Sequence, residues 1–335
     1  MMDGSLPARQ HFPRAKHWRL RTRVLSCGNR PLLMGIVNVT PDSFSDGGRF
    51  LRLPQQPDHP AAGGTSATNQ TSAQGGTAAD SINPASAPFS SLVDHQAAIQ
   101  YGLKLVADGA DLLDVGGEST RPGAEPVSAE EELRRVLPVV AGLCQQAGVP
   151  VSIDTYKAQV ARAAIDAGAE IINDVTALTA DPEMAPLAAY SGCGVCVMHM
   201  QGTPQTMQIA PSYADVLPEV MQFLADRRDC LVAAGVEQDR IAVDPGIGFG
   251  KTCQHNLTLL ANAWRFHALG CPVLIGPSRK RFIGEVLGDM SADRTAGTIG
   301  VALALAQQGV QVLRVHDVAA VSQALRLWQA AGGAL

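Results

Sequence analysis

Eight short apolar runs, separated by segments with helical periodicity, constrain the fold of this chain more than any other feature. Each run is apolar on both faces, which is typical of strands in a parallel sheet that is covered on both sides. The runs lie at residues 32–37, 111–115, 150–153, 170–173, 194–198, 240–243, 272–275 and 311–315. The pattern therefore predicts an α/β fold built on a buried parallel sheet.

A weak repeat indicates how these units are arranged. Residues 108–115 (DGADLLDV), 167–174 (AGAEIIND) and 308–315 (QGVQVLRV) each run from a helix-terminating glycine into a strand. Seven strands are followed by a helix-like segment and the last by Val318–Gln329, which fits a (β/α)8 TIM barrel. An open doubly wound sheet is the alternative. The count of eight and the lack of a G-x-G-x-x-G motif after the first strand favour the barrel.

Local signals predict some of the remaining elements. The sequence SAEE at 128–131 predicts a capping box for a helix that stops near Gly148. Asp154 and Thr155 can cap the following helix, which is expected to end at Gly168. Residues 18–25 are expected to form a short N-terminal hairpin under the barrel floor.

The composition divides the chain into a single barrel domain at 16–335, an N-terminal extension at 1–15 and an insertion at 51–91 after the first strand. Residues 53–91 contain no Lys or Arg and consist mostly of Ala, Gly, Ser, Thr, Pro, Gln and Asn. Such a segment buries too little apolar surface to offset the entropy lost on ordering. We expect the extension to be disordered and the insertion to be flexible, with partner binding as the alternative role for the insertion.

Charge and cysteine usage exclude several classes of protein. A formal net charge of −5 over 335 residues argues against binding to nucleic acid or a membrane surface, which requires clustered cations. There is no apolar signal core, and no apolar run approaches the roughly 20 residues of a spanning helix. The seven cysteines are expected to be free thiols, with Cys193 and Cys196 buried and structural. These features predict a soluble, cytoplasmic protein.

The stretch DPGIGFGKT at 244–252 is similar to a phosphate-binding P-loop. That motif needs a glycine at position 245 so that successive N–H groups can surround a phosphate, and the residue is Pro245. Because proline has no N–H to donate, the stretch is not interpreted as a nucleotide loop. Lys251 is expected to be solvated or packed locally.

Polar residues follow every predicted strand. Because parallel strands of a barrel end at one rim, where barrel enzymes place their chemistry, these side chains should surround one cavity. An Asp after a strand is also a common helix cap, and for Asp154 or Asp174 alone the two interpretations are equally good. The polar ends are Asn38–Gly48, Asp114–Gly123, Asp154-Thr155, Asn173-Asp174, His199–Gly202, Asp244–Gly246, Ser278–Arg281 and Arg314–Asp317.

The mixture of carboxylates and cations indicates which class of ligand the site binds. A carboxylate can accept two parallel N–H bonds from the edge of an aminopyrimidinone ring. The cations, which suit an anionic or phosphorylated group, are Arg279, Lys280, Arg281, Arg314 and His316. Of these, Arg281 is expected to be solvated.

Taken together, the motifs resemble the dihydropteroate synthase family, the folate-pathway enzymes inhibited by sulfonamides. MGIVNVTPDSFSDGG (34–48) and DVGGESTRPGA (114–124) are similar to the first two signatures of the family. SIDTYK, INDVTAL, VMHMQGTPQTMQ, DPGIGFGK, SRKRFIG and RVHDV follow in the family order. The resemblance covers the chain except for about the first dozen residues and the insertion.

The resemblance implies a TIM barrel, a homodimer and a Mg²⁺-dependent reaction. The reaction joins (7,8-dihydropterin-6-yl)methyl diphosphate to 4-aminobenzoate, forming 7,8-dihydropteroate and diphosphate. By resemblance, the pterin is bound by Asp154, Asn173, Asp244, Lys280 and Met198, and the diphosphate by Thr120, Arg314, His316 and Asn38. Asn38 also helps hold the metal. The aminobenzoate pocket and its mobile loops comprise Thr40, Asp42, Phe44, Ser45, Asp46, Ser119, Arg121, Pro122, Phe249 and Ser278, together with Lys280.

A dissociative mechanism is implied, in which the electron-rich dihydropterin delocalises the positive charge left on its methylene carbon. Asp46 and Asp114 are candidates for stabilising that cation, and Asp46 is the stronger because its loop can close over the site. The catalytic set is then Asp46, Arg314, His316 and Lys280.

Two rival functions share part of this pattern. A barrel that transfers methyl from methyltetrahydrofolate to a corrinoid protein would share the ring-binding set Asp154, Asn173 and Asp244. It would lack the first loop and the Ser-Arg-Lys and Arg-Val-His strand ends. A non-catalytic pterin-binding paralogue would have no need of the residues for diphosphate.

Overall fold

The computed structural model describes residues 12–40, 94–120 and 123–333. Residues 51–91, predicted to form a flexible insertion, lie outside these ranges, as does most of the predicted N-terminal extension. Among the described residues, no helix is long and apolar enough to cross a membrane.

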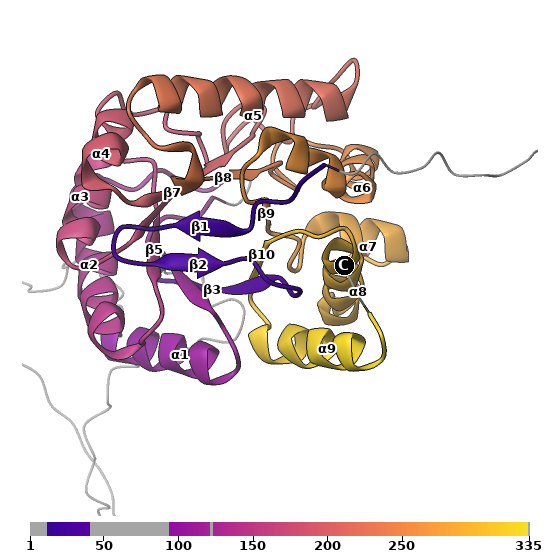
Figure 1. The fold of residues 1–335 in the computed structure, drawn as a ribbon, viewed down its shortest axis with the longest axis horizontal. Coiled ribbons are helices and arrows are strands. Elements are labelled where there is room, and N and C mark those ends of the chain that lie inside the picture. The colour runs from indigo at the N-terminus through magenta and orange to yellow at the C-terminus, as the bar shows by residue number, and fades with distance from the viewer. Residues whose placement is uncertain (1–11, 41–93, 121–122, 334–335) are drawn as a thin grey trace, which may run out of the picture.

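Eight parallel strands form the centre of the fold (Figure 1). The sheet order is β8-β7-β6-β5-β4-β3-β10-β9, and a parallel bridge between Val243 and Val273 joins the two ends, closing the sheet into a barrel. The strands are β3 (Leu32–Asn38), β4 (Leu112–Gly116), β5 (Val151–Asp154), β6 (Ile171–Asp174), β7 (Gly194–Met198), β8 (Ile241–Asp244), β9 (Leu274–Ile275) and β10 (Val312–Val315). The predicted (β/α)8 barrel is therefore confirmed.

Most strands begin one or two residues later than the apolar pattern predicts. The residues before β4 and β6 carry charged side chains that pair with other residues. Asp111, for example, pairs with Arg30 at 2.7 Å and accepts from the Leu33 N–H at 2.8 Å. Glu170 pairs with Arg23 at 2.8 Å.

Helices surround the barrel and bury their apolar faces against the outside of the strands (Figure 1). They are α1 (His95–Ala107), α2 (Ala129–Gln146), α3 (Ala158–Asp166), α4 (Met184–Ser191), α5 (Val216–Ala233), α6 (Cys253–Ala261), α7 (Arg281–Leu287), α8 (Thr295–Gln307) and α9 (Val318–Ala330). Short 3-10 helices lie at η2 (Gln238–Arg240) and η3 (Ala263–Leu269). The last predicted helix, 318–329, is confirmed.

The predicted helix caps have mixed outcomes. Ser128 caps α2, accepting from the N–H of Glu131 at 3.2 Å, although the Glu131 carboxylate pairs with arginines one turn further on. The prediction that Asp154 caps α3 is wrong. The N-cap residue is Lys157, which makes no side-chain cap bond, and the Asp154 carboxylate is held by Arg314 across the barrel.

The predicted hairpin is confirmed, and it seals the barrel floor. Strands β1 (His17–Arg19) and β2 (Val24–Ser26) pair antiparallel and cross the end of the barrel that faces the viewer in Figure 1. Trp18 is fully buried, and its Nε1 donates to the Arg240 carbonyl at 2.8 Å. The hairpin packs closely enough that a Cβ on Gly194 would lie 2.5 Å from the Leu20 side chain. Any cavity must therefore open at the opposite rim.

Side chains alternate between the inside and the outside of each strand. The lowest inward-facing ring packs on Trp18 and Leu20 and consists of Met34, Leu112, Ile171, Cys196, Ala242, Leu274 and Val312. Cys196 belongs to this inner cluster and Cys193 to the outer one, so the two thiols of the C-x-x-C pair are buried on opposite faces, as predicted. All seven cysteines are free.

Candidate active site

Above the apolar ring, the barrel interior becomes polar. Arg314 on β10 donates from Nε to Asp114 on β4 at 2.6 Å and from Nη2 to Asp154 on β5 at 2.8 Å. Asn173 on β6 donates to the same Asp114 oxygen at 3.0 Å. Four strand ends that are far apart in sequence are thus joined into one network.

Asp244 ends β8, where it is buried and lies in register with Met198 of β7. Its Oδ1 accepts from the N–H of Gly246 at 2.7 Å. Burial raises the pKa of Asp244 to about 6, opposed by that hydrogen bond and by the positive charges of Lys280, Lys251 and Arg314. A carboxylate held in this way is poised to gain stability from further N–H donors.

Lys280 precedes α7 and extends towards Asp244 and Asp154. Its Nζ lies 4.0 Å from the centre of the Phe249 ring, a cation–π contact. Burial lowers the pKa of Lys280 to about 8, as does the nearby charge of Arg314, while Asp244 and Asp154 raise it. The amine therefore contacts an aromatic face, and the charges of two carboxylates favour its protonated form.

The ends of β9, β10 and β3 supply hydroxyl, imidazole and amide groups. Ser278 is buried, and its Oγ accepts from the His316 backbone N–H at 3.2 Å and lies 3.0 Å from His316 Nδ1. Asn38 ends β3, in register with Gly116 of β4, which is itself in register with Asp154. His316 therefore follows the strand that carries Arg314, and Asn38 ends the neighbouring strand β3.

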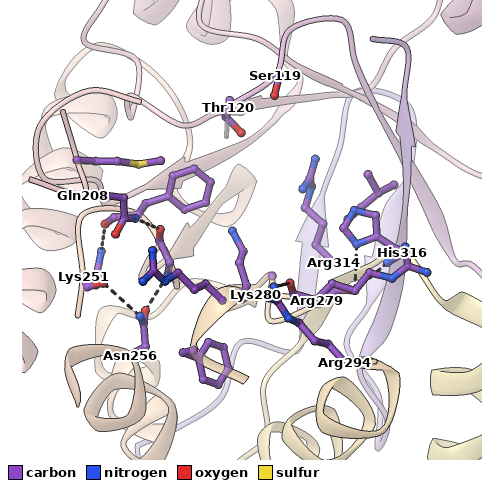
Figure 2. Close-up of a pocket in the computed structure, with 18 of the residues that line it drawn as sticks. Ser119, Thr120, Gln208, Lys251, Asn256, Arg279, Lys280, Arg294, Arg314 and His316 are labelled. Atoms are coloured by element: carbon purple, nitrogen blue, oxygen red, sulfur yellow. Dashed lines mark hydrogen bonds between the residues drawn. The ribbon is translucent and has the colours of Figure 1, made fainter. Parts of the chain in front are cut away.

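These groups surround a cavity of about 940 Å³ at the open end of the barrel. Figure 2 shows Arg314, Lys280 and His316 rising from the strand ends, with Ser119 and Thr120 across from them. The predicted site residues that line the cavity are Asn38, Thr40, Ser119, Thr120, Asp154, Phe249, Ser278, Lys280, Arg314 and His316. Asn173, Met198 and Asp244 lie beside them at the ends of β6, β7 and β8.

The remaining predicted site residues, Asp42, Phe44, Ser45, Asp46, Arg121 and Pro122, lie outside the described residues. Of the other cations in the pattern, Arg281 is exposed and pairs with Glu285 at 2.7 Å, as expected for a solvated residue. Arg279 lines the cavity and pairs with Asp317 at 2.6 Å. For Asp174, the interpretations as a helix cap and as a site residue were equally good. Its carboxylate is buried and accepts hydrogen bonds from the N–H and hydroxyl of Thr176 and the N–H of Leu178, which stabilise the loop after β6.

Lys251 is not solvated, although it packs locally. Only 3% of it is exposed, and its Nζ donates to the carbonyls of His199 and Phe249. The alternative of a solvated Lys251 is therefore wrong, because the glycine-rich turn folds its side chain back towards β7.

Sequence reasoning also missed a charged cluster beside the second loop. Lys157 pairs with Glu118, which lines the cavity, and with Glu132 of α2 at 2.6 Å. The hydroxyl of Tyr156 donates to Glu118 at 2.9 Å. No local sequence signal reveals this cluster, because its members come from three separate segments.

Comparison with known proteins identifies the family. The model of the pterin binding enzymes matches residues 82–316. The dihydropteroate synthases of Escherichia coli K12 and Neisseria meningitidis serogroup C are 39% and 41% identical over 90% and 91% of this chain, covering 92% and 94% of theirs. The chain belongs to the dihydropteroate synthase family.

Solved dihydropteroate synthases share the fold. The Xanthomonas albilineans enzyme with 4-aminobenzoic acid has a TM-score of 0.76 and 41% identity, covering 96% of this chain and 100% of the other. The Yersinia pestis enzyme in a sulfonamide complex has a TM-score of 0.78 and 37% identity, with 95% and 100% coverage. The expected resemblance to dihydropteroate synthases is confirmed across the barrel.

Proposed function

We propose that this protein condenses (7,8-dihydropterin-6-yl)methyl diphosphate with 4-aminobenzoate, releasing diphosphate and forming 7,8-dihydropteroate. The observation that carries the proposal is the network in which Arg314 joins Asp114 and Asp154 beside the amine of Lys280. Carboxylates that recognise a heterocycle and cations that accept a departing anion are thereby placed at one cavity. The family membership and its transferase activity support the same reaction.

The pterin ring is assigned to the inner part of this cavity. Asp244 and Asp154 are carboxylates that can accept paired N–H bonds from the ring edge, and Asn173 can both donate and accept. Lys280 and Met198 complete the proposed ring-binding set. Because these groups are largely buried, the competing hydration of each hydrogen bond is reduced.

The diphosphate is assigned to Arg314, His316, Thr120 and Asn38, which line the cavity. The guanidinium of Arg314 has five N–H donors, and its bonds to Asp114 and Asp154 use two of them. As the C–O bond to the methylene carbon breaks, both electrons leave with the diphosphate. Fixed positive charges at this position favour the step because they meet negative charge as it develops.

The aminobenzoate is assigned to the outer part of the cavity, between Phe249, Lys280 and Ser278 on one side and Thr40 and Ser119 on the other. Arg121, Pro122 and the first-loop residues Asp42, Phe44, Ser45 and Asp46 remain part of this proposal. The neutral arylamine nitrogen forms the new C–N bond and then loses its proton, so no strong general base is required. Asp46 and Asp114 are assigned to stabilise the transient cation.

The donor set fits Mg²⁺ bound mainly through substrate. Among the described residues, no group of three or more His, Cys, Asp or Glu side chains is placed to hold a metal ion. Mg²⁺ at phosphate sites commonly uses one or two protein ligands together with phosphate oxygens and water. Asn38, whose side chain ends in an amide oxygen, suits that role beside the diphosphate residues. When bound, the ion would neutralise charge on the leaving group.

Two further properties carried over from the family stay proposals: assembly as a homodimer through barrel helices, and a cytoplasmic location. The homodimer is tested by sedimentation of the purified chain at several concentrations. A mass that stays at one chain would contradict it.

The proposed reaction is tested by complementation of a folate-auxotrophic strain that lacks its own dihydropteroate synthase. The wild-type gene is expected to restore growth and Lys280→Ala to fail. Lys104→Ala is the matched control, because this exposed lysine pairs with Asp108 at the end of α1 and does not line the cavity, and it is expected to support growth. A methyl-transferring barrel or a non-catalytic pterin-binding protein would not rescue, so failure of the wild-type gene at normal protein levels would overturn the proposal.

A further inference from the structure

Lys251 lines the cavity, but its amine is bonded to the protein behind the cavity wall. Its three N–H donors have three acceptors: the Phe249 carbonyl at 2.9 Å, His199 Nδ1 at 3.0 Å and the His199 carbonyl at 3.2 Å. Burial lowers the pKa of Lys251 to about 7, opposed by the charge of Asp244. In its protonated form Lys251 only donates, so His199 Nδ1 accepts and the neutral imidazole carries its proton on Nε2. Burial and the charge of Lys251 lower the pKa of His199 to about 3, in agreement with that assignment.

The turn that contains Lys251 is pressed against the loop after β7. A Cβ on Gly246 would lie 1.9 Å from the His199 carbonyl oxygen, and a Cβ on Gly250 would lie 2.4 Å from that of Gln201. Glycine is therefore required at both positions, and the two backbones touch. Lys251 donates to the His199 carbonyl at this contact, so it fastens the two loops together.

Side chains hold all four carbonyl groups of residues 248–251 and the N–H of Gly248. The bonds are Gly248 N–H to Asn256 Oδ1 at 2.7 Å, Gln208 Nε2 to the Gly248 carbonyl at 3.0 Å, Tyr213 Oη to the Gly250 carbonyl at 2.7 Å and Asn256 Nδ2 to the Lys251 carbonyl at 3.4 Å. Figure 2 shows Gln208, Asn256 and Lys251 gathered around this turn. Within it, Lys251 holds the Phe249 carbonyl.

Phe249 connects this turn to the site, because its ring lies against the amine of Lys280 at 4.0 Å. A methionine at position 251 would fill similar space without the cost of burying a charge, but it could not donate to the Phe249 carbonyl. We infer that Lys251 is a positioning residue, which fixes the Phe249 ring and thereby the aminobenzoate side of the cavity. This inference rests on the proposed function, and Lys251 itself makes no contact with the reacting atoms.

The test separates the binding of the two substrates in Lys251→Met. The KM for 4-aminobenzoate is expected to rise about tenfold or more, the size expected for losing a hydrogen bond from a charged group. The Kd of the pterin diphosphate, measured by calorimetry, should rise less than the aminobenzoate KM, because the bond between Asp244 and Gly246 remains and only the nearby charge of Lys251 is lost. An equal rise in the aminobenzoate KM and the pterin diphosphate Kd would overturn the inference.

A double-mutant cycle with Phe249→Ala asks whether Lys251 acts through that ring. Adding Lys251→Met to Phe249→Ala is expected to raise the aminobenzoate KM by less than about twofold further. Full additivity of the two effects would contradict the inference. Lys251→Arg keeps N–H donors at this position and is expected to recover part of the affinity for 4-aminobenzoate. If Lys251→Met does not fold, the aminobenzoate KM and the pterin Kd are compared in Lys251→Arg instead.

Trp18→Phe is the control for general loss of stability. It removes the bond from Trp18 Nε1 to the Arg240 carbonyl at the closed end of the barrel. Its Tm should fall while both substrate constants stay within about twofold, since the two ends of the barrel are independent sites. If the wild-type protein shows no turnover, the proposed function fails. The inference alone fails if the wild type turns over but the substrate constants of Lys251→Met change only in proportion to its loss of Tm.

Discussion

Arg314 donates to Asp114 at 2.6 Å inside the barrel, and the Asp114 side chain has no exposed surface. The ion pair therefore compensates for a fully buried charge at the centre of the site. Arg314 also binds Asp154 at 2.8 Å, so its removal would leave two carboxylates without their cation.

Arg314→Met is expected to lower the free energy of unfolding by about 3–5 kcal/mol, as measured by urea denaturation at pH 8. Adding Asp114→Asn should recover part of that loss, because it removes one of the two buried carboxylates that lose their cation. Arg281→Met is the control and should change stability by less than about 0.5 kcal/mol, since its pair with Glu285 is exposed. Wild-type stability in Arg314→Met would contradict this account of the network.

Asp244→Asn is expected to weaken binding of the pterin diphosphate about 10- to 100-fold, because an amide cannot accept two parallel N–H bonds as a carboxylate does. Calorimetry of the purified variant measures the change. Asp239→Asn, at the closed end of the barrel beside Arg19, is the control and should bind normally. Near-normal affinity in Asp244→Asn would refute the assignment.

The same substitution should stabilise the fold, by an amount that depends on pH. The pKa of Asp244 is raised from 3.8 to about 6 in the folded protein, so the folded state disfavours the charged form. The associated stability is present below about pH 4 and is lost as the pH rises through about 6. Asp244→Asn should therefore gain up to about 3 kcal/mol at pH 8 and little at pH 4. Thermal unfolding at the two pH values checks this, and a lower Tm at pH 8 would contradict it.

Lys280→Ala is expected to reduce kcat/KM for both substrates, by about tenfold or more each, because the amine contacts the Phe249 ring and the charges of Asp244 and Asp154 favour its protonated form. Steady-state kinetics with each substrate varied in turn provides the measurement. If kcat/KM for either substrate is unchanged, Lys280 does not serve both subsites.

The fold could be predicted from sequence because its signals are local. The apolar runs mark the strands, and the segment at 18–25 marks the hairpin. The contacts of the site are not local, since Arg314 and Asp114 are 200 residues apart. The helix cap predicted for Asp154 was wrong for that reason, because the sequence around it does not show the arginine across the barrel. Lys251 was left open because only the folded turn shows which way its amine points.

We propose that one rim of the barrel gathers a heterocycle-binding set and an anion-accepting set around a single cavity. The most direct test is turnover of the purified protein with (7,8-dihydropterin-6-yl)methyl diphosphate, 4-aminobenzoate and Mg²⁺, measured as diphosphate released and 7,8-dihydropteroate formed. We expect diphosphate and 7,8-dihydropteroate to appear in equal amounts and only when both substrates are present. Absence of 7,8-dihydropteroate from a folded protein that binds the pterin diphosphate would contradict this proposal.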